Sequence, residues 1–181
     1  MPITSLNELT GDYVLDVAHT RIGFVARHTL STRVRGRFGT FEGSAYVDGE
    51  RPTRSTVRLV IQADDIQTRN RQRDDLVRAK FLDVPNHPTI TFASTHILQS
   101  TASHYEVTGD LTLRGTTRPT LLTVELTDSD TDAQGNLWAT FQGSATLNRK
   151  DWNINWNALT SATISPKVLV EFEATAIRRP A

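Results

Sequence analysis

The sequence predicts an all-β domain, an antiparallel barrel or sandwich of about eight strands with one short crossing helix. Most of the chain alternates apolar and polar residues with a period of two, which is the pattern of half-buried strands. Clusters of Gly, Pro and Asp interrupt this alternation at regular intervals, as turns do in barrels and sandwiches. Only one stretch, residues 64–80, breaks the alternation with helical character. Because a closed barrel leaves no exposed strand edge, it is the preferred arrangement.

Size and composition limit the kinds of protein that this chain can be. At 181 residues it fits one domain, expected over residues 11–181 after a flexible leader at residues 1–10. The 20 basic and 20 acidic residues cancel, which argues against nucleic acid as a partner that covers the whole surface. The absence of cysteine excludes disulfides, thiolate catalysis and zinc–thiolate sites.

The N-terminal residues have neither the basic start nor the apolar run of a secretory signal, so a cytoplasmic location is expected. No window of the sequence approaches the roughly 18 consecutive apolar residues of a membrane helix. Contact with a membrane is therefore expected to be transient at most.

Residues 19–47 comprise two alternating strands with an Arg-rich corner between them. In the first strand Phe24 shares an apolar face with His28, because strand side chains alternate between the two faces. In the second strand small residues such as Gly43 stand between larger ones, which leaves room for a group to approach the backbone. The corner itself, residues 28–36, is expected to form a single helical turn.

The same alternation predicts the remaining strands and leaves one helix. That helix is expected over residues 64–80, capped by Asp64 or Asp65, lying across one end of the sheet with its Arg-rich face in water. Two prolines within residues 83–88 end it. The other strands are expected at residues 12–17, 57–63, 89–98, 105–113, 120–127, 137–147 and 168–177.

The inward faces of these strands define a candidate interior. On the pattern alone a filled interior is favoured, although about eight strands can also enclose a single ligand. The same positions would line the cavity if the barrel is hollow. The predicted lining residues are Val14, Ile22, Phe24, His28, Phe38, Phe41, Leu59, Ile61, Ile90, Phe92, Leu111, Leu113, Phe141 and Leu147.

Several motifs in order resemble one known family. The strings are GFVARHTLSTRVRGRFGTFEGSAYVD, DDIQTRNRQRDD followed by FLDVPNHPTITFAST, GDLTLRGTTRPTLLTVEL, and FQGSATLNRKDWNI. Together they resemble the YceI-like family of polyisoprenoid-binding proteins over residues 13–176. The resemblance implies an extended, lipocalin-like barrel with a long tubular cavity for an isoprenoid chain, such as a polyprenyl lipid or a quinone tail. It also implies a homodimer, and it reverses the preference for a filled interior.

Little in the sequence indicates catalysis. No nucleophile elbow, HExxH helix, phosphate-binding loop or dinucleotide-binding glycine motif is present. The five histidines include no i, i+4 pair, so we expect no catalytic residue, no metal and no cofactor besides the lipid ligand. His28 could hydrogen-bond a ligand head group or simply pair with local backbone. The arginines of the corner could attract a pyrophosphate or an acidic membrane, or form an ordinary solvated face.

Three functional hypotheses follow from the sequence. The first is a soluble, non-catalytic binder or carrier of a polyisoprenoid or similar long-chain amphiphile. The second is an enzyme that modifies a lipid or quinone on the same barrel, with His28 as acid or base. The third is a dimeric interaction module with a filled core.

Overall fold

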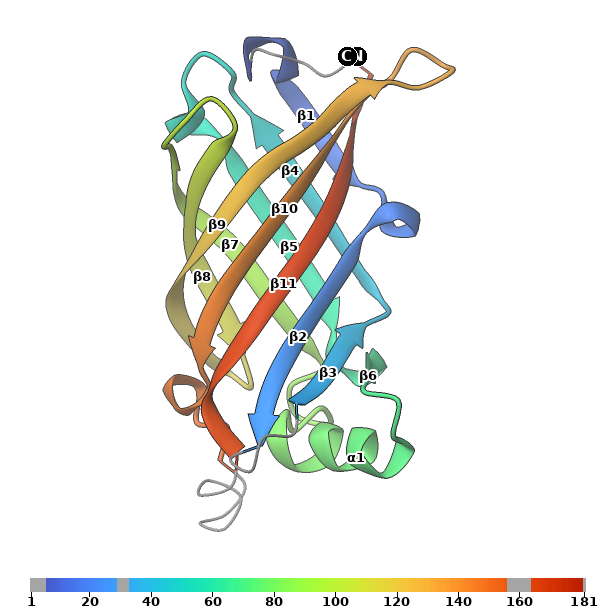
Figure 1. Cartoon of the computed structure of the whole chain (residues 1–181), viewed down its shortest axis with the longest axis vertical. Coiled ribbons are helices and arrows are strands. Elements are labelled where there is room, and N and C mark those ends of the chain that lie inside the picture. Colours follow the sequence, from blue (N-terminus) through green and yellow to red (C-terminus); the bar gives the residue numbers. More distant parts are fainter. Residues whose placement is uncertain (1–5, 29–32, 156–163, 181) are drawn as a thin grey trace.

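A computed structural model describes residues 6–28, 33–155 and 164–180 of the chain. Its strands form one antiparallel sheet that closes into a barrel, as the alternation predicts (Figure 1). Closure comes from the pairing of β1 with β11, the first and last strands of the chain. The barrel strands, in the order in which they pair, are β1 (Gly11–Leu15), β4 (Phe41–Val47), β5 (Thr56–Gln62), β7 (Thr89–Gln99), β8 (His104–Leu113), β9 (Thr116–Thr131), β10 (Leu137–Asn148) and β11 (Ile164–Arg178).

Along one of its edges, the long strand β11 pairs with two different strands. Near its C-terminal end it pairs with β1, where Val14 lies opposite Ile177. Over its first two thirds it pairs with β2 (Arg21–His28), where Phe24 lies opposite Val170. β3 (Arg33–Phe38) then pairs with β2, and the two-residue β6 (Ile66–Gln67) pairs with β3. The barrel wall is therefore continued by β2, β3 and β6 toward the end at which the helix lies (Figure 1).

The only α-helix of the described residues is α1 (Arg71–Leu76), which lies at one end of the barrel (Figure 1). It continues into a π-helical turn, η5 (Val77–Phe81). We call this end of the molecule the helix end and the other the closed end. The 3-10 turns are η1 (Leu6–Leu9), η2 (Val17–His19), η3 (Pro52–Arg54), η4 (Ala63–Asp65) and η6 (Arg149–Trp152).

The helix begins later than its sequence predicts. Asn70, and not Asp64 or Asp65, is the N-cap, and its side chain accepts a hydrogen bond from the backbone N–H of Arg73. The two aspartates belong instead to the 3-10 turn that precedes β6. Arg69 has φ 62°, so the backbone turns sharply just before the cap. The prediction of a helix across the barrel end was right, and its predicted N-cap was wrong.

Three other predicted boundaries also differ. Residues 33–36, which belong to the corner expected to form a helical turn, lie in the strand β3, because pairing with β2 satisfies their backbone. β9 continues to Thr131 through an irregularity in its register with β10, beyond the predicted turn at residue 128. β11 begins at Ile164 instead of residue 168. Long-range pairing extends each of these strands past the turn-forming residues in its sequence.

The predicted leader is packed over part of its length. Leu6–Leu9 forms a 3-10 turn, and Leu9 is 1% exposed. It packs in a buried cluster with Tyr13, Leu137 and Ala139 at the end of the barrel opposite the helix. Leu9, one of the ten residues expected to be flexible, therefore contributes to the fold. Within the described ranges, no helix has the length and apolar character that crossing a membrane requires.

Candidate functional site

A cavity of about 680 Å³ lies inside the barrel. This volume falls within the range of roughly 300–1,000 Å³ that is usual for small-molecule sites. Residues of β1, β2, β4, β5 and β7–β11 border it, and apolar side chains predominate among them. The cavity extends from Tyr13 near the closed end to Leu76 and Val77 at the helix end. The alternating strands therefore enclose a long apolar space.

The inward face of β11 shows that the space is hollow. Val168, Val170 and Phe172 point inward and alternate with the exposed Leu169 and Glu171. In a filled core such inward residues would be fully buried, as close packing leaves few voids larger than a water molecule. None of the three is fully buried, although all lie inside a closed barrel.

Three phenylalanine rings lie flat against the barrel wall because glycines face them. The distal ring atoms of Phe172 lie over Gly143, its direct partner on β10, so closely that a Cβ on that glycine would overlap the ring. Phe24 lies over Gly36 of β3 in the same way, again between direct cross-strand partners. The third ring, on Phe92, lies over a glycine of β8. Rings that lie along the wall leave the middle of the barrel open.

The closed end is organised by Tyr13. Its side chain is 3% exposed, and its hydroxyl donates a hydrogen bond of 2.6 Å to the carbonyl oxygen of Leu9. Burial raises the pKa of Tyr13 to about 12, partly opposed by the nearby Arg178 cation. A buried phenol with a hydrogen-bonded hydroxyl stabilises the packing at this end, because it buries apolar area without leaving a polar atom unpaired.

A second buried cluster lies toward the helix end. Trp152 and Ile154 pack there with Leu82 and Leu113. The indole N–H of Trp152 donates to the carbonyl oxygen of Leu111 at 3.0 Å. Trp152 therefore packs as core, from the 3-10 turn η6. Trp156, four positions further on, lies outside the described residues.

Arg149 fixes the chain that follows β10. Its guanidinium donates to the carbonyl oxygens of Ile154 at 2.8 Å and Ile164 at 2.7 Å. The side chain borders the cavity and is buried, and desolvation lowers its pKa from the ordinary arginine value. By bridging two segments, Arg149 holds the start of β11 against the turn η6 at the helix end of the cavity.

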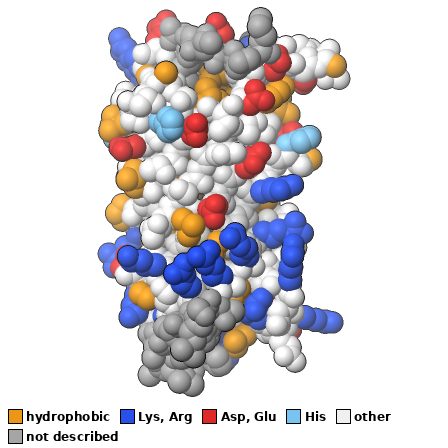
Figure 2. All heavy atoms as spheres, viewed as in Figure 1, with side chains coloured by type: hydrophobic (Ala, Val, Ile, Leu, Met, Phe, Trp, Pro, Cys, Tyr) orange, Lys and Arg blue, Asp and Glu red, His pale blue; other side chains and the backbone are white. Residues whose placement is uncertain are grey.

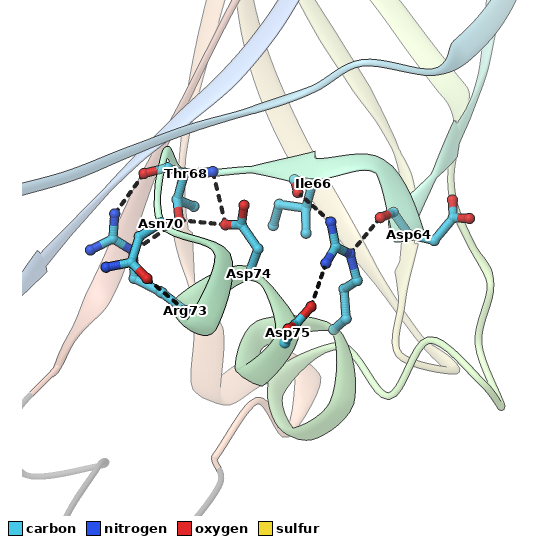
Figure 3. Close-up of polar contacts among 8 residues, drawn as sticks. Asp64, Ile66, Thr68, Asn70, Arg73, Asp74 and Asp75 are labelled. Atoms are coloured by element: carbon cyan, nitrogen blue, oxygen red, sulfur yellow. Dashed lines mark hydrogen bonds and ion pairs between the residues drawn. The ribbon is translucent and has the colours of Figure 1, made fainter.

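Helix α1 is held over the cavity by a buried carboxylate (Figure 3). Asp74 accepts hydrogen bonds from both the backbone N–H and the hydroxyl of Thr68, just after β6. Arg73 donates to the same threonine, to its hydroxyl oxygen at 2.8 Å and to its carbonyl oxygen at 2.6 Å. Thr68 and Arg73 both border the cavity. These bonds place Leu76 and Val77 against the cavity.

A second set of contacts holds the outer side of the helix (Figure 3). Arg78 donates to the backbone carbonyl oxygens of Asp64 at 2.6 Å and Ile66 at 3.2 Å. It also forms an ion pair of 3.0 Å with Asp75. Asp74 and Asp75 thus point to different partners, as expected of adjacent residues on a helix, and do not form a working pair of carboxylates.

Most of the predicted lining residues do border the cavity. They are Ile22, Phe24, Phe38, Leu59, Ile61, Ile90, Phe92, Leu111, Leu113, Phe141 and Leu147. Phe41 belongs instead to the buried cluster toward the helix end. The side chain of His28, at the end of β2, lies outside the described residues. Its suggested contact with a ligand therefore stays a prediction.

The prediction that the side chain of Val14 lines the cavity was wrong. Its position borders the cavity, but its side chain is 39% exposed and lies on the outer face of β1. Its neighbours Tyr13 and Leu15 are the inward residues of this strand. The apolar character of Val14 suggested the wrong face, because in YVL both faces of the strand carry an apolar residue.

The sequence reasoning missed the contribution of β11. Val168, Val170 and Phe172 border the cavity, and so do Ala174 and Ala176. The signal was present in VLVEFEATA, where apolar residues alternate with Leu169, Glu171 and Glu173. Missed residues at the helix end, such as Leu76 of α1, could be found only from the tertiary position of the helix.

The chemistry of the cavity suits an apolar guest. Its polar margins include the hydroxyls of Thr20, Thr68 and Thr120 and the cations of Arg73 and Arg149. In the part of the chain that the structure describes, no three His, Asp or Glu side chains gather as a metal site would require. The site therefore offers dispersion and burial of hydrocarbon along its length, with hydrogen bonds at its edges.

Comparison with known proteins places these features in one family. The YceI-like domain model matches residues 13–176. A UPF0312 protein of Pseudomonas paraeruginosa is 34% identical over 154 residues, which covers 83% of this chain and 80% of the relative. A UPF0312 protein of Pectobacterium carotovorum is 34% identical over 149 residues, covering 81% and 77% of the two chains.

Solved structures agree in fold at lower identity. Burkholderia cenocepacia BcnA superposes with a TM-score of 0.80 at 19% identity, covering 89% of this chain and 98% of that one. A polyisoprenoid binding domain from Saccharophagus degradans gives a TM-score of 0.67 at 18% identity, covering 92% and 98%. A hollow barrel capped by one short helix and a family match over nearly its full length lead to one conclusion: the chain belongs to the YceI-like family.

Proposed function

We propose that this protein is a non-catalytic binder or carrier of a polyisoprenoid, such as a polyprenyl lipid or a quinone tail, or of a similar long-chain amphiphile. The observation that carries the proposal is the cavity of about 680 Å³ along a barrel whose inward residues are apolar. The name of the Saccharophagus degradans domain, a polyisoprenoid binding domain of the same fold, adds support.

Burial of hydrocarbon is sufficient to drive such binding. Each buried methylene contributes about 0.8 kcal/mol, so a five-carbon isoprene unit contributes on the order of 3 kcal/mol before ordering costs. A few units therefore supply enough free energy for tight binding without any charged contact. The wall positions of Phe24 and Phe172 keep the interior free for the chain.

The first test is what the purified protein carries. We expect organic extraction and mass spectrometry to recover a long-chain isoprenoid or a similar amphiphile. Protein that is empty and also fails to take up a detergent-dispersed polyprenol would contradict the proposal.

A matched pair of variants on β11 tests the location. Val170 points into the barrel and Leu169 points outward, one residue away. We expect Val170→Trp to reduce polyprenol affinity at least tenfold, because the indole fills the space, while Leu169→Trp leaves affinity unchanged. Circular dichroism checks that both variants fold. Equal affinities in two folded variants would place the lipid outside the barrel.

The alternatives make different predictions. An interaction module with a filled core is disfavoured by the open space beside β11. An enzyme on the same barrel would lose turnover of a quinone or lipid in a His28→Ala variant that still binds its ligand. No described contact favours that reaction over simple binding.

We also propose that the protein is a homodimer, as its family resemblance implies. Sedimentation equilibrium tests this directly. A mass close to 40 kDa, about twice the chain mass of 20.2 kDa, is expected. A single species at the chain mass, at micromolar concentration, would contradict it.

A further inference from the structure

The charged residues are distributed unevenly along the barrel, although the chain is neutral overall. Figure 2 shows Lys and Arg side chains gathered in a band toward the helix end, and Asp and Glu side chains mainly above it. The strand ends and turns of the closed end carry Glu8, Asp12, Asp48, Glu50, Glu106, Glu125, Asp128, Asp130 and Asp132. The net charge of the chain is zero, but basic residues predominate at the helix end and acidic residues at the closed end.

The band is densest on β2 and β3. Arg33, Arg35 and Arg37 are exposed on alternate positions of β3, on its outer face. Arg27 of β2 lies directly opposite Arg33. Like charges directly opposite each other on paired strands are destabilising. Among the described residues, Arg27, Arg33 and Arg35 make no ion pair that would offset this repulsion.

Other elements extend the positive charge around the same end. Arg71 and Lys80 are exposed on the helical segment. Arg118, Lys150 and Lys167 are exposed on β9, η6 and β11. We call all these cations, with those of β2 and β3, the helix-end basic surface. Three of the acidic residues there accept hydrogen bonds: Asp74 from Thr68, Asp75 from Arg78, and Asp65 from Thr40. The basic residues of this end still outnumber its acidic ones.

We propose that the helix-end basic surface docks on an anionic lipid bilayer. Its cations stand on several elements around one end of the barrel. Each Lys or Arg near an anionic membrane adds to the affinity by charge attraction, so several suffice for reversible attachment. Such attachment places the helix end of the cavity, where Leu76 and Val77 border it, at the membrane.

The use of this contact for lipid transfer rests on the proposed function, whereas the docking itself does not. A carrier of a water-insoluble chain must collect it from a bilayer and return it there. The apolar cavity extends to the helix end, where α1 borders it, and a buried cluster around Tyr13 packs at the opposite end. The basic surface and the reach of the cavity therefore point to the same end of the molecule.

A bilayer fits this surface better than a nucleic acid does. Proteins that bind single strands without sequence preference combine basic grooves with aromatic side chains on which bases stack. Among the described residues the exposed large hydrophobics include one aromatic, Tyr46, which lies on β4 outside the basic surface. An exposed aliphatic residue, Leu169 of β11, lies opposite Val25 of β2, and Val25 in turn lies opposite Arg35 of β3. An aliphatic side chain suits a lipid interface.

Vesicle sedimentation of the full chain tests the docking. We expect binding to phosphatidylcholine vesicles that contain 30% phosphatidylglycerol, and none to phosphatidylcholine alone. In 0.5 M salt the binding should be lost, because the Debye length falls to a few ångströms. R33E/R35E should weaken it at least about tenfold, since two attractive charges become repulsive ones.

The closed end offers a matched control. Arg51 and Arg54 are exposed on and beside η3, so R51E/R54E changes the net charge by the same amount at the other end. This control should bind vesicles as the unmodified protein does. If R33E/R35E does not fold, R71E/K80E tests the same surface from the helical segment.

Three results would overturn the docking proposal: no binding to anionic vesicles, equal weakening by both double variants, or tighter binding to a mixed-sequence oligonucleotide than to vesicles. The uptake of detergent-dispersed polyprenol separates this proposal from the proposed function. Loss of docking with normal uptake in R33E/R35E is the expected outcome. Docking by a protein that takes up no lipid would contradict the carrier function and leave the membrane contact standing.

Discussion

At the residue scale, the paired glycines and phenylalanines decide how much space the barrel contains. The ring of Phe172 lies over Gly143 on the neighbouring strand, in a direct cross-strand pair. A side chain at Gly143 would push this ring away from the wall. The ring would then enter the space that a ligand chain needs.

Gly143→Ala should therefore reduce ligand affinity as well as stability. Overpacking of this kind typically costs about 1–3 kcal/mol of unfolding free energy. Polyprenol titration and urea denaturation measure the two effects. In Gly143→Ala/Phe172→Ala the overlapping ring is gone, and affinity should return toward that of the unmodified protein. If the single variant binds normally, Phe172 does not control the open space.

Tyr13 makes the barrel sensitive to alkaline pH. Its pKa is about 12 in the folded protein, against 10.0 for an ordinary tyrosine. The folded state thus holds the phenolic proton more tightly than the unfolded state does. The stability that results is fully present below about pH 10 and is lost as the pH rises toward 12.

Tyr13→Phe should flatten the decline of stability between about pH 10 and 12. At neutral pH the same variant should lose about 1 kcal/mol, because the hydrogen bond to Leu9 is absent. Urea denaturation across this pH range measures both effects. Tyr46→Phe, at an exposed position, is the control and should change neither. An unchanged pH dependence in Tyr13→Phe would exclude this tyrosine as the cause.

At the scale of elements, α1 is too short to be stable alone, since isolated helices shorter than about 12 residues are marginal in water. Its position depends on its tertiary hydrogen bonds. The buried carboxylate of Asp74 satisfies both donors of Thr68 and so joins the helix to β6. The helix is therefore a fixed part of the cavity border.

Two adjacent aspartates provide a test of this anchoring. Asp74 is 9% exposed, whereas the side chain of Asp75 is 66% exposed in its ion pair with Arg78. Asp74→Ala leaves buried donors of Thr68 without an acceptor and should cost about 2–3 kcal/mol of unfolding free energy. Asp75→Ala should cost well under about 1 kcal/mol. Equal losses in urea denaturation would show that the buried bond is not the anchor.

At the scale of the whole molecule, the cavity inside the barrel has a limited size. The closed end of the barrel is packed around Tyr13 and Leu9, which takes up part of the interior at that end. The cavity volume of about 680 Å³ sets a limit on the hydrocarbon that can be buried. Affinity should therefore depend on chain length up to that limit.

A series of polyprenols of increasing length tests this limit. Each added isoprene unit should raise affinity at first, by at most about 3–4 kcal/mol at 0.8 kcal/mol per methylene. The increase should stop once the cavity is full, and the rise in Tm on ligand addition should reach a plateau at the same length. Isothermal titration in dilute detergent measures the affinities. Affinity that is independent of length from the shortest member would contradict binding inside the barrel.

The sequence predicted the strands and their inward faces more completely than the start of the helix. The strands β2 and β4 were predicted with their inward faces, because alternation with a period of two is a local property of the chain. The face of β1 was misassigned at Val14, where both faces carry apolar residues. The N-cap of α1 was missed because Asn70 competes locally with Asp64 and Asp65, and tertiary contacts decide among them.

By itself, the sequence determined that the chain forms antiparallel strands with a helix across one end, because strand alternation and turn residues are local. Only the tertiary structure decided that the interior is open. Hollowness depends on where the two barrel walls stand and on pairs such as Gly143 and Phe172, which lie 29 positions apart and meet only when β10 pairs with β11. Periodicity assigns a residue to the inner face, and the packing across the barrel determines whether that face meets another side chain or empty space.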